Sequence, residues 1–384
     1  MGNICSNSVG SVVEPCYNKL LELNIKEKDW KGQKKVVETL NLHLSPPVLQ
    51  DTLLTVDSNL SVKITGCLFQ GKDPKEELLK PCQDNFAIVQ RGPHILSLVF
   101  DGHGREGQQV ADFCKTFMTS YFEKNHMFFG IKPELTIKQM FESCYKKLST
   151  SEIDCTLSGT TAVAVYLKEN QITVGHVGDS RAVLGTLPNK KVIYRPYKPQ
   201  PYKRYIPLTK VLSAVALTTD HKPNFPEENR RIAKCGGIVA KCVSEEGREE
   251  GPYRVWAKGK NYPGLAMSRS IGDTVAFDIG VVPEPVVSQK ELHPGTDQFI
   301  VIASDGVWDV MSNFEVVNFV EKFKKACKKE GGNSYPAKPE NSSIARLLCE
   351  EARYRWMRIV EEEDGLIDDI SAVVIEIGYT LHLN

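Results

Sequence analysis

The chain has 384 residues, of which 41% are hydrophobic and 25% charged, so it can form one large folded domain or two ordinary ones. Its 48 basic and 48 acidic residues cancel, which argues against a nucleic-acid-binding protein and against any function that needs a strong global charge. The eleven cysteines form no C-x-x-C pair, which predicts reduced thiols in the cytosol or nucleus. Without an apolar run of about 18 residues or a signal peptide, we expect a cytoplasmic protein.

The first residues, Met1-Gly2-Asn3-Ile4-Cys5-Ser6, match the pattern for N-myristoylation on Gly2, with Cys5 placed for palmitoylation. The pattern is short, and a plain chain terminus is the alternative. The rest of the extension, to about residue 45, mixes charges with leucines that could form one amphipathic helix. Acylation would associate an otherwise cytoplasmic protein with membranes.

Runs rich in β-branched and aromatic residues predict strands along the chain. These runs cover residues 86–90, 94–100, 160–167, 171–177, 181–184, 298–303 and 370–377. Several are apolar throughout, so we expect them to be buried on both faces. Because strands pair closely in sequence and helices come in blocks, the order predicts an α+β fold: two packed, mainly antiparallel sheets flanked by helices, an α-β-β-α sandwich.

Apolar stripes at 3.6-residue spacing predict the helices. The first two stripes consist of Val110, Phe113, Phe117 and Tyr121, and of Ile137, Met140, Phe141, Cys144 and Leu148. A third helix should begin at Pro226 and end before Gly236, and a fourth should follow a capping box of Ser312 and Glu315. A last long helix is expected from about Ser343 to Glu361.

Residues 186–210 combine lysines, arginines, tyrosines and prolines, which predicts an exposed excursion. A primary role in nucleic-acid or membrane-surface binding is the alternative for this basic insertion. The lack of a basic recognition helix counts against nucleic acid.

Aspartates recur where apolar strands run into turns: Asp101 before Gly102, Asp179 after Gly178, Asp305 before Gly306, and Asp368 before Asp369. Such carboxylates can point into a cleft, and an adjacent glycine lets a backbone carbonyl approach a ligand. Hard cations such as Mg²⁺ and Mn²⁺ prefer oxygen ligands of this kind. One Asp-Gly is usually a plain turn, but four strand-end aspartates favour a binuclear site for hydrolysis.

The same aspartates stand in an ordered set of motifs. These are DGHG (101–104), SGTTAV (158–163), VGDSRAVL (177–184), TTDHKP (218–223), RIAKCGGIV (231–239), PGLAMSRSIGD (263–273), ASDGVWDVMS (303–312) and DDISAVVI (368–375). From about residue 60 to 378 the chain resembles the type 2C family of metal-dependent protein serine/threonine phosphatases. The resemblance implies a phosphatase domain over residues 46–384, with the basic insertion at about 186–210 and a flap at about 240–262.

By that resemblance, two Mg²⁺ or Mn²⁺ ions would activate a water for attack on phosphoserine or phosphothreonine, with a third, weaker ion in some states. Asp101 would bridge the two metals, and Gly102 would ligate one through its carbonyl. Asp305 and Asp368 would hold the other metal, and Asp179 the third. His103, otherwise an ordinary turn histidine, would be the general acid for the leaving alkoxide.

Near the start of the domain the chain departs from the pattern common in the family. It has Lys80-Pro81-Cys82-Gln83-Asp84 where many members place an arginine and a Glu-Asp pair. Asp84 would act through metal-bound water, and Lys80 is either a phosphate ligand or a surface lysine. The expected partners are the phosphoprotein substrates of a monomeric signalling enzyme. The alternative function is a catalytically silent, phosphoprotein-binding scaffold of the same fold.

Overall fold

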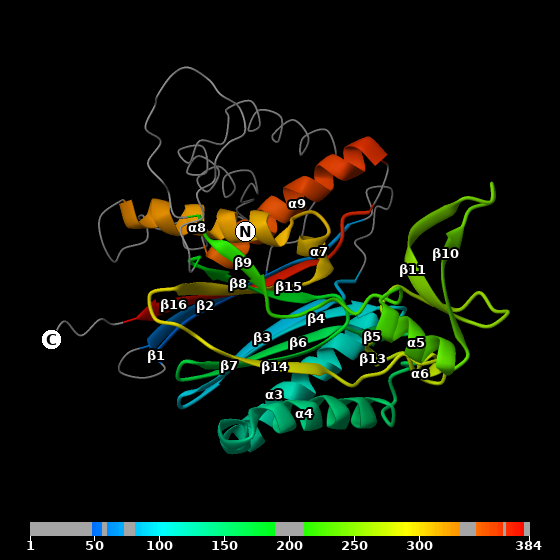
Figure 1. The fold of residues 1–384 in the computed structure, drawn as a ribbon, viewed down its shortest axis with the longest axis horizontal. Coiled ribbons are helices and arrows are strands. Elements are labelled where there is room, and N and C mark those ends of the chain that lie inside the picture. Colours follow the sequence, from blue (N-terminus) through cyan, green and yellow to red (C-terminus); the bar gives the residue numbers. More distant parts are fainter. Residues whose placement is uncertain are drawn as a thin grey trace, which may run out of the picture.

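The structure is a computed structural model that describes residues 48–55, 60–72, 81–188, 211–329, 343–363 and 366–379. The predictions for the N-terminal extension, for Gly2, Cys5 and Lys80, and for most of the basic insertion therefore lie outside the described residues. In the described part, two sheets pack face to face between two pairs of helices (Figure 1). None of its helices combines the length and the hydropathy that a membrane span requires.

The first sheet lies under the helices α8 (Asn313–Lys329) and α9 (Ile344–Glu363). Its strands are, in spatial order, β1 (Val48–Thr55), β2 (Leu60–Phe69), β16 (Ile370–Tyr379), β15 (Asp297–Ala303), β8 (Arg181–Thr186) and β9 (Ser213–Ala216). The basic insertion leaves from β8 and returns to β9, which pair with each other. Its two ends are thus adjacent on one edge of this sheet.

The second sheet lies against α3 (Gly107–Ile131) and α4 (Pro133–Leu148). Its strands are, in spatial order, β13 (Ile271–Gly272), β5 (Gly159–Thr160), β4 (His94–His103), β6 (Ala162–Lys168), β7 (Gln171–Val177) and β14 (Val286–Glu291), with β3 (Asp84–Arg91) paired to β4. The pairs of named strands are antiparallel in both sheets. The expected α-β-β-α sandwich is confirmed.

The central strands are apolar throughout because both of their faces are buried. On β15, Phe299 and Val301 pack toward α8 and α9, whereas Ile300 and Ile302 pack between the two sheets. Since side chains alternate across a strand, a layer of core forms on each face. The four-layer arrangement therefore follows from the composition of these strands.

Every predicted strand is present, with one interruption. The run 160–167 is split at Thr161, which instead bonds Asp101: its amide donates to the Asp101 carbonyl (2.9 Å) and its Oγ1 accepts from the Asp101 amide (3.1 Å). Strands β1, β2, β9, β13 and β14, and the three strands of the smaller sheet described below, were not predicted. The β14 strand has polar, exposed side chains and is held by pairing with β7, which a hydrophobic pattern does not register.

The predicted helices are also present. The capping box is confirmed, because Ser312 donates to Glu315 and the Glu315 amide donates back to the Ser312 hydroxyl at 3.3 Å. The stripe expected on α3 is displaced by one residue. The most deeply buried line runs through Val110, Cys114, Met118 and Phe122, while Phe113, Phe117 and Tyr121 are half-buried and pack on one another beside it.

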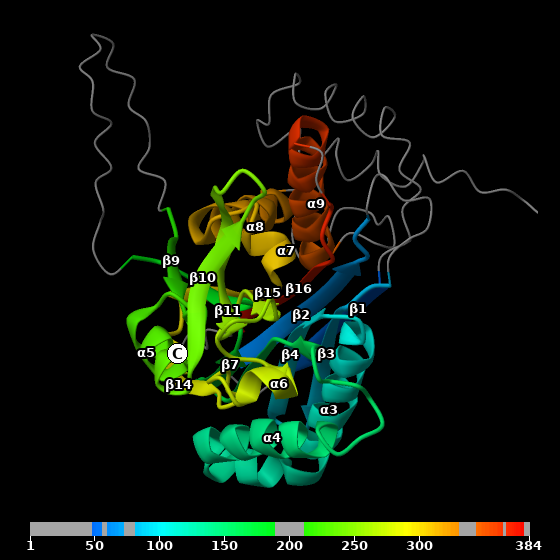
Figure 2. The ribbon, with the colours of Figure 1, turned by 90° about the vertical axis from the view of Figure 1, so that its right-hand side faces the viewer.

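A third, smaller sheet projects from one end of the sandwich beyond the helix α5 (Pro226–Lys234) (Figure 2). It consists of β10 (Gly237–Val243), β11 (Glu249–Ala257) and β12 (Pro263–Leu265). Its antiparallel hairpin coincides with the segment expected to be a flap; movement of that segment stays a prediction. A small core that includes Ile232 and Val255 joins it to α5.

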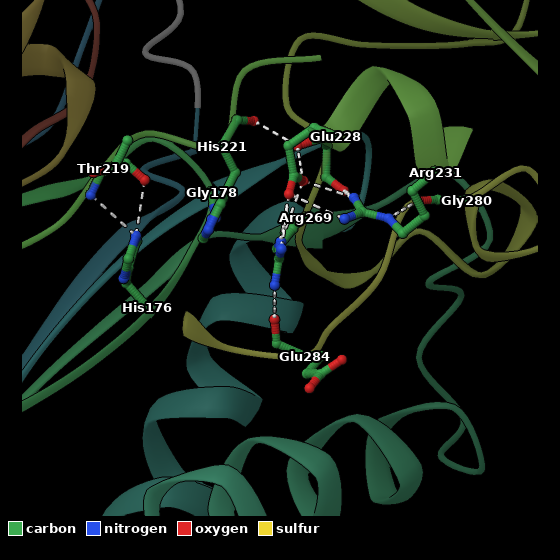
Figure 3. A network of polar contacts seen from close by, with 10 residues as sticks. His176, Gly178, Thr219, His221, Glu228, Arg231, Arg269, Gly280 and Glu284 are labelled. Atoms are coloured by element: carbon green, nitrogen blue, oxygen red, sulfur yellow. Dashed lines mark hydrogen bonds and ion pairs between the residues drawn. The ribbon is translucent and has the colours of Figure 1, made fainter. Parts of the chain in front are cut away.

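An ion-pair network fixes α5 at the base of this sheet (Figure 3). The Glu228 carboxylate, whose side chain is 8% exposed, accepts hydrogen bonds from Arg231 (2.7 Å), Arg269 (2.7 Å) and Ser268. Arg231 also donates to the carbonyls of Gly280 and Ser268. Burial by itself raises the pKa of Glu228, but the hydrogen bonds from the two arginines and the serine outweigh it and lower the pKa.

The network reaches the sandwich through His221, whose carbonyl accepts from the Ser268 amide (2.8 Å) and hydroxyl (3.0 Å). The His221 ring stacks on His176 at 4.5 Å, and burial lowers its pKa to about 2. The ring is therefore neutral, and its Nδ1 accepts a hydrogen bond from the Gly178 amide (3.1 Å). One chain of contacts thus connects α5 to the turn that carries Asp179.

We expect Glu228→Gln to lower the free energy of unfolding by about 3 kcal/mol, because it leaves two arginines without their buried counter-charge. Because the pKa of Glu228 is lowered in the folded state, its stabilisation is complete above the ordinary carboxyl pKa and is lost progressively as the pH falls toward the folded-state pKa, so the stability difference from wild type should be smaller at about pH 3.5 than at about pH 7. Denaturant unfolding at both pH values measures this. The neighbouring exposed Glu227→Gln serves as the control and should change stability by less than about 0.5 kcal/mol.

Candidate metal centre

Strand ends of both sheets place carboxylates at one edge of the sandwich. Asp84 begins β3 and lies directly opposite Asp101 near the end of β4. Asp179 occupies the turn between β7 and β8, and Asp305 follows β15 as the first residue of the short helix α7 (Asp305–Trp308). Asp368 precedes β16, the neighbour of β15. The antiparallel register therefore converts a set scattered over the sequence into one cluster.

Three of these carboxylates are close enough to share a cation. Oxygens of Asp101, Asp179 and Asp305 all lie within 4.8 Å of one another. Burial raises the pKa of Asp101 well above its ordinary value, and the charges of Asp305 and Asp84 raise it further. The pKa of Asp305 is raised for the same reasons, with Asp179 and Asp368 as the nearest like charges. Such mutual repulsion is relieved by a positive ion.

The donor set fits a hard divalent cation. Asp84 Oδ2 and Asp179 Oδ1 are buried and have no hydrogen-bond partner among the described residues. Burial, together with the charge of Asp369, raises the pKa of Asp84 to about 8. A buried carboxylate oxygen without a donor is costly unless a cation faces it, and oxygen-only ligation suits Mg²⁺ or Mn²⁺. The predicted positions Asp84, Asp101, Asp179 and Asp305 thus come together here.

The loop after Asp101 is packed so tightly that Gly102 accepts no side chain. A Cβ there would lie 2.4 Å from the Gly107 carbonyl oxygen and 2.7 Å from that of Gln83. Gln83 braces the loop, because its carbonyl accepts from the Gly102 amide (3.0 Å) and its Nε2 donates to the Gly104 carbonyl (2.6 Å). Metal ligation by the Gly102 carbonyl stays a prediction.

The neighbouring residues Asp368 and Asp369 have different surroundings in the site. Asp369 is buried and accepts from the Gly71 amide (2.5 Å) and the Gln83 amide (2.8 Å), so it ties β2 and the start of β3 to the site. The charge of Asp368 raises the pKa of Asp84, Asp101 and Asp305, which places it beside the cluster although it is not among the three closest carboxylates. The negatively charged carboxylate of Asp369 thus accepts hydrogen bonds from two backbone amides.

Several residues of the site were contained in the sequence motifs but not singled out there. Lys222 pairs with Asp179 at 2.5 Å, and Arg181 makes a two-pronged contact with Asp220 at 2.7 and 2.9 Å. Asp309, one turn after Asp305, adds repulsion to it. The Lys222 ammonium therefore partly balances the cluster. The sequence signal that could have identified Lys222 as a site residue was its position beside Asp220 and His221 in one motif.

His103 has a carboxylate partner that sequence reasoning missed. Its Nε2 lies 2.7 Å from Asp273 Oδ2, which also accepts from the Ser270 hydroxyl at 2.6 Å. Burial alone would lower the pKa of His103, but the charge and hydrogen bond of Asp273 outweigh it and raise the pKa. Its Nδ1 has no partner among the described residues. Only pairing of β13 with β5 and of β5 with β4 brings these two residues together.

A sequence model described as protein phosphatase 2C matches residues 75–356. Probable protein phosphatase 2C 34 from Arabidopsis thaliana is 32% identical, covering 72% of this chain and 70% of that protein. Probable protein phosphatase 2C 35 from the same plant is 30% identical, with coverage of 78% and 79%. Probable protein phosphatase 2C 12 from Oryza sativa subsp. japonica is 38% identical over 58% of this chain, which spans about half (47%) of that relative.

Solved structures agree on the fold. The crystal structure of a serine-threonine phosphatase 2C from Toxoplasma gondii has a TM-score of 0.60 at 20% identity and covers 87% of this chain and 99% of its own. The structure of a C. elegans sex determining protein has a TM-score of 0.58 at 19% identity, and the match covers 82% of this chain and 64% of that one. The sequence model spans most of the chain, and the motif aspartates that it includes meet at one edge of the sandwich. The chain belongs to the protein phosphatase 2C family.

Proposed function

We propose that this protein is a metal-dependent serine/threonine phosphatase that uses two Mg²⁺ or Mn²⁺ ions, with a third, weaker ion at Asp179. The observation that carries the proposal is the cluster of Asp101, Asp179 and Asp305, whose oxygens lie within 4.8 Å of one another. Buried carboxylate oxygens without donors at Asp84 and Asp179 support it further. The substrates are phosphoserine and phosphothreonine in proteins, as the family membership suggests.

Each carboxylate has a defined place in this proposal. Asp101 would contact both ions, the Gly102 carbonyl would face one of them, and Asp305 and Asp368 would hold the other. Asp84 would contribute through a water. When bound, the ions lower the pKa of a water and neutralise charge on the phosphate.

The residues of the chain itself supply orientation and a proton. Asp273 holds the Nε2 side of His103, and Nδ1, which is buried and has no hydrogen-bond partner among the described residues, would be the nitrogen that contacts a bound substrate. From there the imidazole would donate a proton to the leaving serine or threonine oxygen, whose alkoxide is strongly basic. Asp273 would thus position His103 without touching the substrate.

A catalytically silent scaffold is the alternative function. Buried, mutually repelling carboxylates cost stability, and a scaffold would gain nothing from keeping them. Their presence, with unpartnered oxygens, favours the enzyme.

We propose further that Gly2 and Cys5 carry acyl chains that associate the protein with membranes. The proposal rests on the sequence pattern at the N-terminus. One myristoyl chain binds a bilayer only marginally, so palmitate on Cys5 would be the second anchor.

Asp101→Asn and Asp305→Asn should each lower hydrolysis of a phosphothreonine peptide in Mn²⁺ by at least about 1000-fold, since each removes a ligand charge worth several kcal/mol. Chelator should abolish wild-type activity, and Mn²⁺ should raise the Tm of wild type more than that of either variant. The exposed Asp278→Asn is the control and should behave as wild type. Wild-type turnover in either variant would contradict the assignment of Asp101 and Asp305 as metal ligands.

His103→Ala should slow hydrolysis of a phosphoserine peptide by about 100-fold or more, because the poor leaving group needs a proton. Hydrolysis of p-nitrophenyl phosphate, whose leaving group needs none, should fall much less. The ratio of the two kcat values is the measurement. Equal losses on both substrates would contradict a general-acid role.

Gly2→Ala should move the full-length protein from the membrane fraction to the soluble fraction of cells, and Cys5→Ser should weaken membrane association. Fractionation with a mass measurement of the N-terminal peptide tests both. Ser8→Ala, a serine outside the six-residue pattern, is the control and should leave the distribution unchanged. If the Gly2→Ala protein distributes between the fractions as wild type does, the proposal of a lipid anchor is wrong.

A further inference from the structure

The third sheet has one covered face and one open face. Val239 and Val255 pack into the small core at α5 on the covered face. Ile238 and Trp256, directly opposite each other on β10 and β11, occupy the other. Ile238 is 42% exposed there, and Val243 at the end of β10 is 65% exposed. Apolar side chains therefore face solvent on a sheet that projects from the molecule.

This open face carries a hollow of about 430 Å³. It is lined by Ile238, Ala240, Lys241, Cys242, Val243, Trp256, Ala257, Gly259, Lys260 and Asn261. The Trp256 ring is held in place, because its Nε1 donates to the Ala240 carbonyl (3.0 Å) and it lies over Gly264, where an added Cβ would meet it at 3.1 Å. The hollow thus has a rigid aromatic wall.

The charge of the lining has one sign. Lys241 and Lys260 are its only charged residues, and no carboxylate lines it. Lys241 is kept over the ring of Tyr253 at 5.3 Å, which orients its ammonium beside the hollow. An apolar wall with two cations fits a ligand that is apolar and acidic.

The strand beside the hollow has a free edge. β10 pairs with β11 and is the outer strand of its sheet in the described part of the chain. Such an edge can accept an extended peptide through main-chain hydrogen bonds, while side-chain pockets set which peptide binds. The sheet projects at the end of the sandwich where β5 and β13 lie (Figure 1). There β5 pairs with the last residues of β4, which include His103.

We propose that this hollow docks an extended, acidic segment with an apolar anchor, located in the phosphoprotein substrate away from its phosphorylated residue. The proposal rests on the proposed phosphatase function and adds the class of substrate. The apolar anchor contacts Ile238 and Trp256, and the acidic side chains pair with Lys241 and Lys260. Docking strengthens substrate binding without affecting the chemical step, so it lowers KM and leaves kcat unchanged.

Two phosphothreonine peptides test the proposal with the full chain in Mn²⁺. They share the residues around phosphothreonine, and one carries a distal segment of alternating leucine and glutamate while the other carries alternating serine and lysine. Wild type should prefer the acidic peptide by about tenfold in kcat/KM, through a lower KM, as expected for ion pairs to the half-buried Lys241 and the exposed Lys260 and for one buried apolar side chain.

The double variant Lys241→Glu/Lys260→Glu should abolish or reverse this preference, and Ile238→Glu should reduce it. Lys258→Glu makes the same single charge change as Lys260→Glu in the same turn, at an exposed residue that does not line the hollow, and it should keep the wild-type ratio. Circular dichroism and the Tm shift produced by Mn²⁺ verify that each variant is folded. A preference that persists in the double variant, or that is lost equally in Lys258→Glu, overturns the docking site.

Two further outcomes separate this inference from the function on which it rests. If wild type hydrolyses p-nitrophenyl phosphate with Mn²⁺ but treats both peptides alike, the docking inference is wrong and the phosphatase function stands. If wild type hydrolyses neither, the proposed function itself has failed. If light scattering finds a dimer that Ile238→Glu dissociates, a second copy of the chain covers this face, and the substrate proposal is overturned.

Discussion

Repulsion among carboxylates that the fold forces to the same edge is the constraint on which the rest of the site depends. The register that pairs Asp84 with Asp101, and the adjacency of β15 to β16, leave these groups no means of separating. Their pKa values rise because burial and like charge act in the same direction. A protein can carry such a cluster only if the surrounding packing offsets the cost, or if cations neutralise it.

The packing that offsets the cost is the four-layer sandwich. Central strands such as β15 bury alternate side chains in two different cores, so their ends cannot shift without disturbing both. Local donors give additional support. Lys222 pairs with Asp179, and two backbone amides bind Asp369, so some of the negative charge is already compensated within the chain. Asp84 Oδ2 and Asp179 Oδ1 stay buried without a donor among the described residues.

A second level of structure connects the site to the projecting sheet. Glu228 joins α5 to Arg269, and the same segment continues to Asp273, the partner of His103. Through Ser268 and His221 it also reaches the turn of Asp179. The position of the sheet and the geometry of His103 therefore depend on shared contacts.

The sequence by itself determined the family, the strand-end aspartates and nearly all buried strands, because apolar runs and short motifs are local signals. It did not reveal the partner of His103, since Asp273 is 170 residues away and is brought close by two short strand pairings. Nor did it reveal β14 or the open face of the third sheet: polar edge strands lack a hydrophobic pattern, and exposure depends on what packs nearby. Which carboxylates approach one another was decided by sheet register, a property of the tertiary structure alone.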